Sequence, residues 1–136
     1  MKCRNTSIES IMKCLIVEDS IIVRRIVGSV LRKLGATHIL EAGDGKTAWN
    51  YLEQESVDLV ITDWNMPEMN GLDLVRTIRK HKQTAHIPVI MITIRDRQDD
   101  VLKAYEYQVN SYIVKPFTLK SLREKIEQVI KATGEK

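Results

Sequence analysis

Cysteine is scarce in this chain, which has two among its 136 residues. Two cysteines cannot supply the disulfide framework of a small secreted domain, and Cys14 stands in an apolar run where we expect a small buried side chain. The longest apolar run, Cys14 to Val17, is far shorter than the roughly 20 residues of a membrane-spanning helix. Residues 1–10 are too polar for a signal peptide. We therefore expect a cytoplasmic protein without a membrane span.

Concentrated charge and repeats are also lacking. Lysine and arginine total 21 against 18 acidic residues, a formal net charge of +3, and the two signs are interspersed along the chain. Nucleic-acid binding needs a concentrated basic face, so we exclude it. There is no linker rich in proline, glycine or serine, and the length suits one domain. We expect that domain over residues 12–132, after a flexible N-terminal extension (1–11) and before a polar C-terminal tail (133–136).

Short apolar runs alternate with longer amphipathic ones. The apolar runs predict strands at Met12–Val17, Thr37–Glu41, Leu59–Thr62, Val89–Thr93 and Ser111–Val114. Apolar spacings of three and four predict helices at 23–34 (ending at Gly35), after a cap at Asp44, at 71–80, at 97–107 and after a cap at Thr118. Continuous Val, Ile and Leu runs are typical of parallel strands buried on both faces. The pattern therefore predicts an α/β fold with a doubly wound parallel sheet.

Polar residues stand at the ends of four predicted strands. Glu18 and Asp19 follow the first strand, Asp63 the third, Thr93 ends the fourth, and Lys115 follows the fifth. The carboxyl ends of parallel strands emerge at one edge, so these side chains should converge there. If the strand order is the flavodoxin-like 2-1-3-4-5, ligands bind beyond the first and third strands.

The convergent set has the composition of a phosphoryl-transfer site. Three crowded carboxylates repel one another unless a cation joins them, and Mg²⁺ favours carboxylates, waters and phosphate oxygens. Lys115 and Thr93 would hold phosphoryl oxygens, which makes Asp63 the predicted phosphoryl acceptor. Taken singly, each residue has a simpler explanation as a turn or cap former. Together they are poorly explained by coincidence.

Several motifs in order carry a resemblance to a known family. They are residues 15–20 (LIVEDS), 41–45 (EAGDG), 62–67 (TDWNMP) with Asn70-Gly71, 91–93 (MIT) and 111–117 (SYIVKPF). The chain resembles the response-regulator receiver family from about residue 13 to 132, and in particular its single-domain, CheY-like chemotaxis regulators. The resemblance implies a flavodoxin-like (βα)5 fold with strand order 2-1-3-4-5.

The resemblance also implies the roles of the site residues. Asp63 would accept a phosphoryl group from a sensor histidine kinase. The Mg²⁺ ligands would be Glu18, through water, with Asp19, Asp63 and the main-chain carbonyl of Asn65. Lys115 would pair with Asp63 or its phosphate, and the Lys115–Pro116 bond would be cis.

Further implications concern the switch and its output. Thr93 would move toward the phosphate and Tyr112 would swing inward. The resulting change would remodel the surface of the fourth helix, fifth strand and fifth helix, where a downstream target such as the flagellar motor switch binds. The protein would be a monomer or a phosphorylation-dependent dimer. It would not be an enzyme beyond supporting its own Mg²⁺-dependent phosphorylation and dephosphorylation.

The chain departs from the family pattern at several positions. Glu18 replaces the more common aspartate, and Ile94 replaces a small residue. Ile94 either limits access to the phosphorylation site, slowing phosphorylation by small donors and hydrolysis, or packs against the fourth helix. Asn65 and Arg95 flank the site from opposite sides, where they could tune dephosphorylation in either direction.

Three more positions carry structural expectations. Gln108 replaces a glycine that ends the fourth helix, so the helix ends differently or Gln108 is left-handed. Trp64 is expected near the pocket mouth or as an ordinary exposed aromatic. Trp49 is expected to contribute to packing.

Competing functions have weaker support in the sequence. Gly45-Lys46-Thr47 ends like a P-loop, but Leu40 stands where that motif needs glycine, so we reject it. A haloacid-dehalogenase-type phosphatase would carry a second aspartate where Asn65 stands. A phosphorelay intermediate and a receiver-like scaffold that is not phosphorylated stay open as alternatives.

Overall fold

The computed structural model describes residues 13–134, so the predicted extension (1–11) and the last two residues of the predicted tail lie outside the described residues. The strands are β1 (Lys13–Val17), β2 (His38–Ala42), β3 (Leu59–Thr62), β4 (Val89–Thr93) and β5 (Ser111–Val114). The helices are α1 (Ile21–Lys33), α2 (Gly45–Gln54), α3 (Gly71–Lys80), α4 (Gln98–Glu106) and α5 (Leu119–Gly134). No helix within residues 13–134 is both long and apolar enough to cross a membrane.

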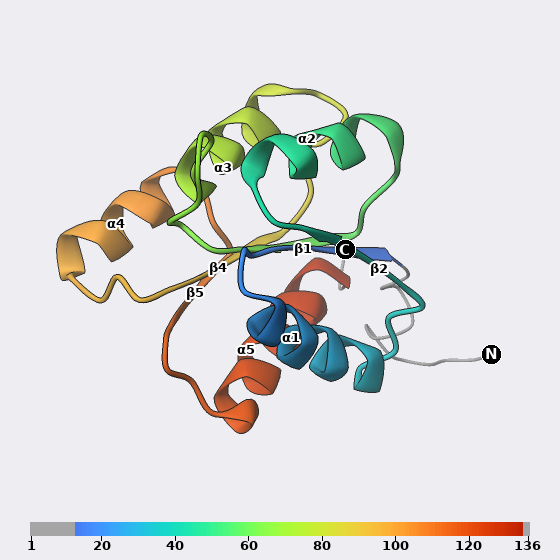
Figure 1. Ribbon diagram of the computed structural model, residues 1–136, viewed down its shortest axis with the longest axis vertical. Helices are drawn as coiled ribbons and strands as arrows, with labels where there is room; N and C mark the ends of the chain where they lie inside the picture. The colour runs from blue at the N-terminus through green and yellow to red at the C-terminus, as the bar shows by residue number, and fades with distance from the viewer. Residues whose placement is uncertain (1–12, 135–136) are drawn as a thin grey trace.

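The five strands form one parallel sheet in the order β2-β1-β3-β4-β5, which confirms the predicted flavodoxin-like topology. Figure 1 shows α1 and α5 against one face of this sheet and α2 and α3 against the other. The order reverses between β1 and β3, which are neighbours although β2 lies between them in sequence. The carboxyl ends of β1 and β3 therefore flank the point where this topology binds ligands.

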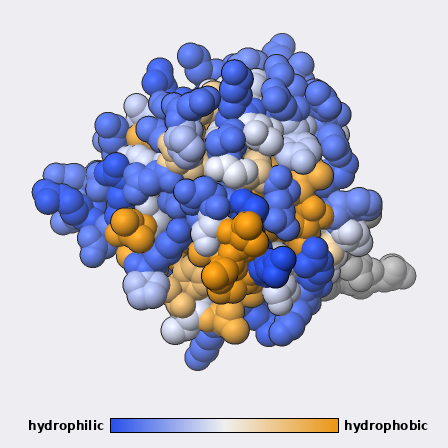
Figure 2. Space-filling model, in the orientation of Figure 1, coloured by the Kyte–Doolittle hydropathy of each residue, from blue (hydrophilic) through white to orange (hydrophobic). Residues whose placement is uncertain are grey.

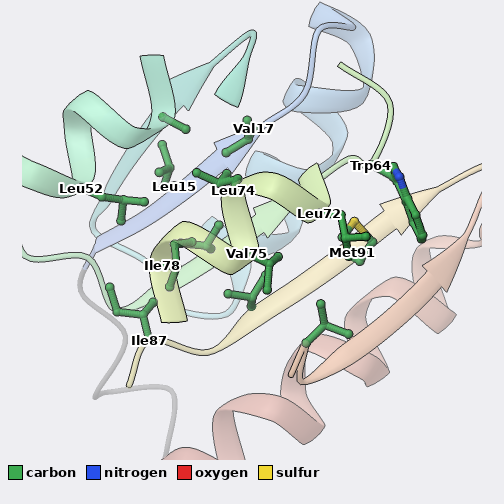
Figure 3. Packing of buried hydrophobic residues seen from close by; sticks show 14 of the residues in the cluster. Leu15, Val17, Leu52, Trp64, Leu72, Leu74, Val75, Ile78, Ile87 and Met91 are labelled. Carbon is green, nitrogen blue, oxygen red and sulfur yellow. The ribbon is translucent and has the colours of Figure 1, made fainter. Parts of the chain in front are cut away.

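Each buried strand contributes side chains to two cores, because successive residues point to opposite faces of a sheet. In β1, Leu15 and Val17 lie in the core beneath α2 and α3, part of which is shown in Figure 3. Cys14 and Ile16 lie in the core formed with α1 and α5. Cys14 is fully buried, as predicted, and burial raises the pKa of its thiol to about 12. Burial on both faces explains why these strands read as continuous apolar runs.

Helix ends follow the predicted capping residues. The side chain of Asp44 accepts a hydrogen bond from the Thr47 N–H at 2.7 Å, and Thr118 Oγ1 accepts one from the Ser121 N–H at 3.0 Å. Gly35 has a φ of 106°, the left-handed geometry that glycine permits after a helix. Gln108 also has a positive φ, 74°. Of the two alternatives for this position, the structure therefore shows the left-handed conformation of Gln108. The capping residues and the glycine thus correctly predicted where these helices begin or end.

The predicted bounds of α1, β2 and α4 differ slightly from the structure, and α1 begins at Ile21 rather than at residue 23. Strand β2 runs one residue later than predicted, because its register with β1 pairs Val17 with Ala42. The N–H of Glu18 then donates to the Ala42 carbonyl at 2.9 Å. Residue Arg97 is the N-terminal cap of α4 rather than its first residue. Pairing with a strand distant in sequence, which local pattern does not encode, sets such a register.

Gly71 fixes the loop that follows Asp63. Its N–H donates to the Trp64 carbonyl at 2.7 Å, and a Cβ at this position would overlap the carbonyl oxygen of Asp63. The overlapping atoms belong to the backbone, so they cannot move aside as a flexible side chain would. The beginning of α3 thus packs directly against the backbone of the candidate phosphoacceptor.

Gly71→Ala should lower the free energy of unfolding by about 2 kcal/mol or more, because the new methyl group must displace the Asp63 backbone. Gly28→Ala is a matched control in α1, where an added Cβ would lie 3.7 Å from Arg32 Nη1 and Ile16 Cδ1, an ordinary contact. This control should leave stability unchanged or raise it by up to about 1 kcal/mol. Urea unfolding measures both, and equal effects would contradict the predicted close approach at Gly71.

Candidate functional site

The predicted site residues converge at the carboxyl edge of the sheet. The N–H of Asp63 donates to the Val17 carbonyl at 2.9 Å, and the N–H of Lys115 donates to the Thr93 carbonyl at 2.8 Å. Sheet pairing thus continues into the residues that follow the strands. It carries Asp63 beside the end of β1 and Lys115 beside the end of β4.

Three carboxylates form the centre of the site. Glu18, Asp19 and Asp63 each offer an oxygen, and these atoms all lie within 4.8 Å of one another. Glu18 and Asp63 are 3% and 7% exposed, whereas Asp19 is exposed. A group of carboxylate oxygens with one side open to solvent suits a hard divalent cation such as Mg²⁺, which keeps several waters. The residues present therefore fit the metal that the sequence predicts.

Lys115 lies between two of these carboxylates. Its Nζ is 2.9 Å from Glu18 Oε1 and 3.0 Å from Asp63 Oδ2. Burial would lower the pKa of the Lys115 ammonium, but hydrogen bonds to Glu18 and Asp63 outweigh it and raise the pKa. Lys115 is therefore a fixed positive charge at the site.

Glu18 remains short of compensating charge in spite of this ammonium. Burial raises the pKa of its carboxyl, although hydrogen bonds from Lys115 and from the Ser20 N–H favour the charged form. The nearby charge of Asp63 adds to the increase. Lys115 contacts two of the three carboxylates, and a further cation would stabilise all three in their charged state.

The carboxylate of Asp63 is held in one orientation. Its Oδ1 accepts hydrogen bonds from the Trp64 N–H at 2.6 Å and from the Asn65 N–H at 3.2 Å. These bonds turn Oδ2 toward Lys115. Fixed orientation of a reacting group lowers the entropy cost of a group-transfer step.

Thr93 and Tyr112 are joined through the main chain of Arg95. Thr93 is fully buried, and its Oγ1 accepts a hydrogen bond from the Arg95 N–H at 3.3 Å. The Tyr112 hydroxyl donates to the Arg95 carbonyl at 2.8 Å. Tyr112 is buried in this structure, and burial, with a smaller effect of Asp100, raises the pKa of its phenol to about 12. The Lys115–Pro116 bond is cis, as predicted.

The side chains of the two residues after Thr93 have different environments. Ile94 is 66% exposed, which excludes the alternative that it is buried against the fourth helix. Arg95 does more than flank the site opposite Asn65, because its Nε donates to Asn65 Oδ1 at 3.1 Å. The two side chains that were expected to flank the site from opposite sides are thus in direct contact.

The expectation that Trp64 is an ordinary exposed aromatic is wrong. Its side chain is buried, 5% exposed, and Figure 3 shows it beside Leu72 and Met91 in the core. The guanidinium carbon of Arg95 lies 4.5 Å from the centroid of its ring and covers it from outside. A covering residue about 30 positions away in sequence cannot be read from local pattern. Trp49 packs against the same core, as predicted.

Sequence reasoning missed Arg24. Its Nη1 donates to the Glu18 carbonyl at 2.6 Å, and its Nε donates to Glu41 Oε1 at 2.9 Å. Arg24 thus ties the loop after β1 to β2 and helps to place Glu18. A signal was present, because a cation in the first turn of a helix is unfavourable toward the helix dipole unless it has a partner.

Apolar side chains border the acidic cluster. Ile21 and Ile22 begin α1 shortly after Asp19 and are 57% and 72% exposed. Figure 2 shows a mostly hydrophilic face on which hydrophobic residues gather over the start of α1. With Ile94, these residues place exposed apolar surface beside a site whose centre is charged.

Known proteins are similar to this chain in sequence and in fold. The response regulator receiver domain family matches residues 14–127. The chain is 46% identical over 118 residues to the chemotaxis protein CheY of Pseudomonas aeruginosa, covering 87% of this chain and 95% of that protein.

Solved structures agree with the fold. The chemotaxis response regulator CheY4 of Vibrio cholerae superposes with a TM-score of 0.81 at 28% identity, covering 88% of this chain and 98% of that one. The receiver domain of a sensor histidine kinase from Pseudomonas aeruginosa, which has magnesium coordinated in its active-site cleft, gives a TM-score of 0.76 at 26% identity, with the same coverage of both chains. This chain belongs to the response regulator receiver domain family.

Proposed function

We propose that this chain is a two-component response regulator that accepts a phosphoryl group on Asp63 from a phosphohistidine of a sensor histidine kinase. The observation that carries the proposal is the Asp63 carboxylate, oriented by two N–H groups and paired with Lys115 inside a cluster of three carboxylates. The receiver unit would comprise residues 12–132 of a cytoplasmic protein. It would act as a monomer or a phosphorylation-dependent dimer.

The proposed transfer uses groups that the site already positions. An oxygen of Asp63 attacks phosphorus, the bond between phosphorus and the histidine nitrogen breaks, and its electron pair stays on the imidazole. Lys115 neutralises charge on the phosphoryl oxygens, and the Thr93 hydroxyl donates to one of them after it moves.

Magnesium would be held by Glu18, acting through water, with Asp19, Asp63 and the main-chain carbonyl of Asn65. When bound, it supplies positive charge that lets an anionic phosphoryl group approach the carboxylates. The cluster of carboxylate oxygens supports this assignment, as does the magnesium in the related receiver domain from Pseudomonas aeruginosa.

Apolar residues around the site support a protein as the phosphoryl donor. A charged centre bordered by Ile21, Ile22 and Ile94 suits a partner that brings its phosphohistidine within a complementary apolar surface. A small phosphate donor would gain little from these side chains.

The proposed output is contact with a downstream protein. Thr93 and Tyr112 both bond to the main chain of Arg95, so movement of Thr93 toward a phosphate would disturb Tyr112 and the start of α4. Leu102 and Tyr105 of α4 and Val114 of β5 are exposed apolar residues on the proposed target surface, which α5 completes. Because the relative from Pseudomonas aeruginosa is a chemotaxis protein, we propose the flagellar motor switch as the target.

Incubation with acetyl phosphate and Mg²⁺ should add one phosphoryl group to the protein. The bond between phosphorus and the bridging oxygen of acetyl phosphate breaks, its electron pair leaves with acetate, and phosphorus becomes bonded to a carboxylate oxygen of Asp63. Intact-mass spectrometry measures the adduct, and Asp63→Asn is the control that should lack it. An unmodified wild-type protein would favour the receiver-like scaffold that is not phosphorylated.

Glu18→Gln should weaken Mg²⁺ binding by on the order of tenfold, about 1.4 kcal/mol, because it removes one of three carboxylate charges. Isothermal titration calorimetry of the unphosphorylated protein measures this affinity. Glu53→Gln removes an exposed carboxylate on α2, outside the cluster, and should leave the affinity unchanged. Equal affinities for the wild type and Glu18→Gln would show that Glu18 does not contribute to metal binding.

Ile94→Ala should speed both phosphorylation by acetyl phosphate and hydrolysis of the product by roughly threefold, or about 0.7 kcal/mol of barrier. The expected cause is wider access to Asp63 once the exposed side chain beside Thr93 is truncated. Ile94→Val, which removes one methylene group, should fall between the wild type and the alanine variant. Unchanged rates in both variants would refute this role for Ile94.

A further inference from the structure

Arg24 connects the first helix to two other parts of the molecule. It lies in the first turn of α1, its Nη1 donates to the Glu18 carbonyl at 2.6 Å, and its Nε donates to Glu41 Oε1 on β2 at 2.9 Å. The Arg24 side chain is 18% exposed, so these bonds are partly shielded from water. Hydrogen bonds with a charged donor are stronger than those between neutral groups. The guanidinium is therefore a fixed bridge between β2 and the loop that follows β1.

The stability of α1 does not explain an arginine at this position. The amino end of a helix carries partial positive charge, so a cation in the first turn is unfavourable, and the first turn of α1 has no acidic residue to offset it. The helix is capped by Ser20, whose side chain accepts a hydrogen bond from the Val23 N–H at 3.2 Å. The favourable contribution of Arg24 must therefore come from its contacts outside the helix.

One of these contacts completes the restraint of Glu18. The Glu18 N–H donates to the Ala42 carbonyl at 2.9 Å, and the Glu18 carbonyl accepts the hydrogen bond from Arg24. The Glu18 carboxylate accepts hydrogen bonds from the Ser20 N–H at 3.0 Å and from Lys115 Nζ at 2.9 Å. Both the main chain and the side chain of Glu18 are thus held in place.

Asp19 lacks such restraints on its side chain. It is exposed, and within residues 13–134 no hydrogen bond or ion pair holds its carboxylate. One of its oxygens nevertheless lies within 4.8 Å of oxygens of Glu18 and Asp63. The peptide between Glu18 and Asp19 is planar, so the direction of the Glu18 carbonyl sets where the Asp19 main chain begins. Arg24, which fixes that carbonyl, therefore bears directly on the position of the Asp19 carboxylate.

We propose that Arg24 is a positioning residue that fixes the Glu18–Asp19 peptide and thereby holds the Asp19 carboxylate where Mg²⁺ requires it. This inference rests on the proposed magnesium site. Mg²⁺ demands near-ideal octahedral geometry, whereas Ca²⁺ tolerates varied ligand arrangements, so a displaced carboxylate weakens Mg²⁺ binding more than Ca²⁺ binding. Removal of Arg24 should therefore weaken Mg²⁺ binding, although the loss of a positive charge beside the carboxylates would by itself strengthen it.

Glu41 orients the guanidinium of Arg24. A planar guanidinium has fixed donor directions, so the bond from Nε to Glu41 also sets the direction in which Nη1 points. Glu41 is itself placed by the parallel register that pairs it with Ile16 of β1. The sheet thus positions Glu41, Glu41 orients Arg24, and Arg24 holds the loop that carries two of the predicted metal ligands. A lysine in place of Arg24 would keep the charge but lose the pair of donors in one plane.

Calorimetric titrations of the unphosphorylated protein with Mg²⁺ and with Ca²⁺ test the proposal. Arg24→Ala should bind Mg²⁺ roughly fivefold more weakly, the equivalent of one lost hydrogen bond, and the ratio of the Mg²⁺ to the Ca²⁺ association constant should fall roughly threefold. Both ions carry two charges, so the purely electrostatic effect of the substitution cancels in this ratio. Arg25→Ala removes an exposed arginine from the same turn of α1 and should leave the ratio unchanged.

Further variants test the route and cover the case in which Arg24→Ala fails to fold. Arg24→Lys keeps the charge and most of the apolar stem, and it should lower the ratio by roughly twofold. Glu41→Gln should also lower it by roughly twofold, but should have no further effect when combined with Arg24→Ala, because the two residues act in series. Urea unfolding in the absence of metal establishes that each variant is folded.

The outcomes separate this inference from the proposed function. If the wild type binds no Mg²⁺, the proposed magnesium site fails and this inference fails with it. If the wild type binds Mg²⁺ and Arg24→Ala or Arg24→Lys keeps the wild-type ratio, only the role of Arg24 is refuted. Stronger Mg²⁺ binding by Arg24→Ala would mean that charge repulsion outweighs positioning, and equal effects of Glu41→Gln with and without Arg24 would mean that Glu41 does not act through Arg24. Either result overturns the proposal.

Discussion

The repulsion among three carboxylates at the edge of the sheet is the constraint around which the site is arranged. Glu18 and Asp63 are buried, and buried charges are stable only with partners. Lys115 supplies one cation to both, and N–H groups at the ends of β1 and β3 supply further hydrogen bonds. The remaining excess of negative charge suits a divalent cation, which is the basis of the proposed binding of magnesium and of a phosphoryl group.

The loop after β4 connects this charge cluster to the rest of the molecule. Three consecutive residues have three different surroundings: Thr93 is buried, Ile94 is exposed, and Arg95 stacks on Trp64. In the proposed switch, a displacement of Thr93 would disturb its neighbours, because the main chain of Arg95 is bonded to both Thr93 and Tyr112. The same short loop thus carries a buried hydroxyl, an exposed apolar side chain and a guanidinium that contacts the Asn65 amide.

Local patterns in the sequence predicted most of the fold. Buried parallel strands appear as continuous apolar runs, and the capping residues stand directly beside the helices that they cap. Asp44 and Thr118 cap the helices as expected. The predictions failed where a strand boundary or the surroundings of a side chain depend on a residue that is distant in sequence. Because of its pairing with β1, β2 begins one residue later than predicted. The cover of Trp64 by Arg95 and the hydrogen bond from Arg24 to the Glu18 carbonyl were not predicted. Such contacts join segments that the chain brings together only on folding.

The sequence alone determined the class of fold, the family and the residues at the strand ends, because each follows from spacing, residue type and motif order. Tertiary structure alone decided how those residues are joined. Only in the folded structure does Lys115 pair with two carboxylates, does Trp64 become buried, and does the side chain of Arg95 donate a hydrogen bond to that of Asn65. The reason is physical: burial and hydrogen bonding depend on the positions of groups in space, and β-sheet topology brings together residues that are far apart along the chain.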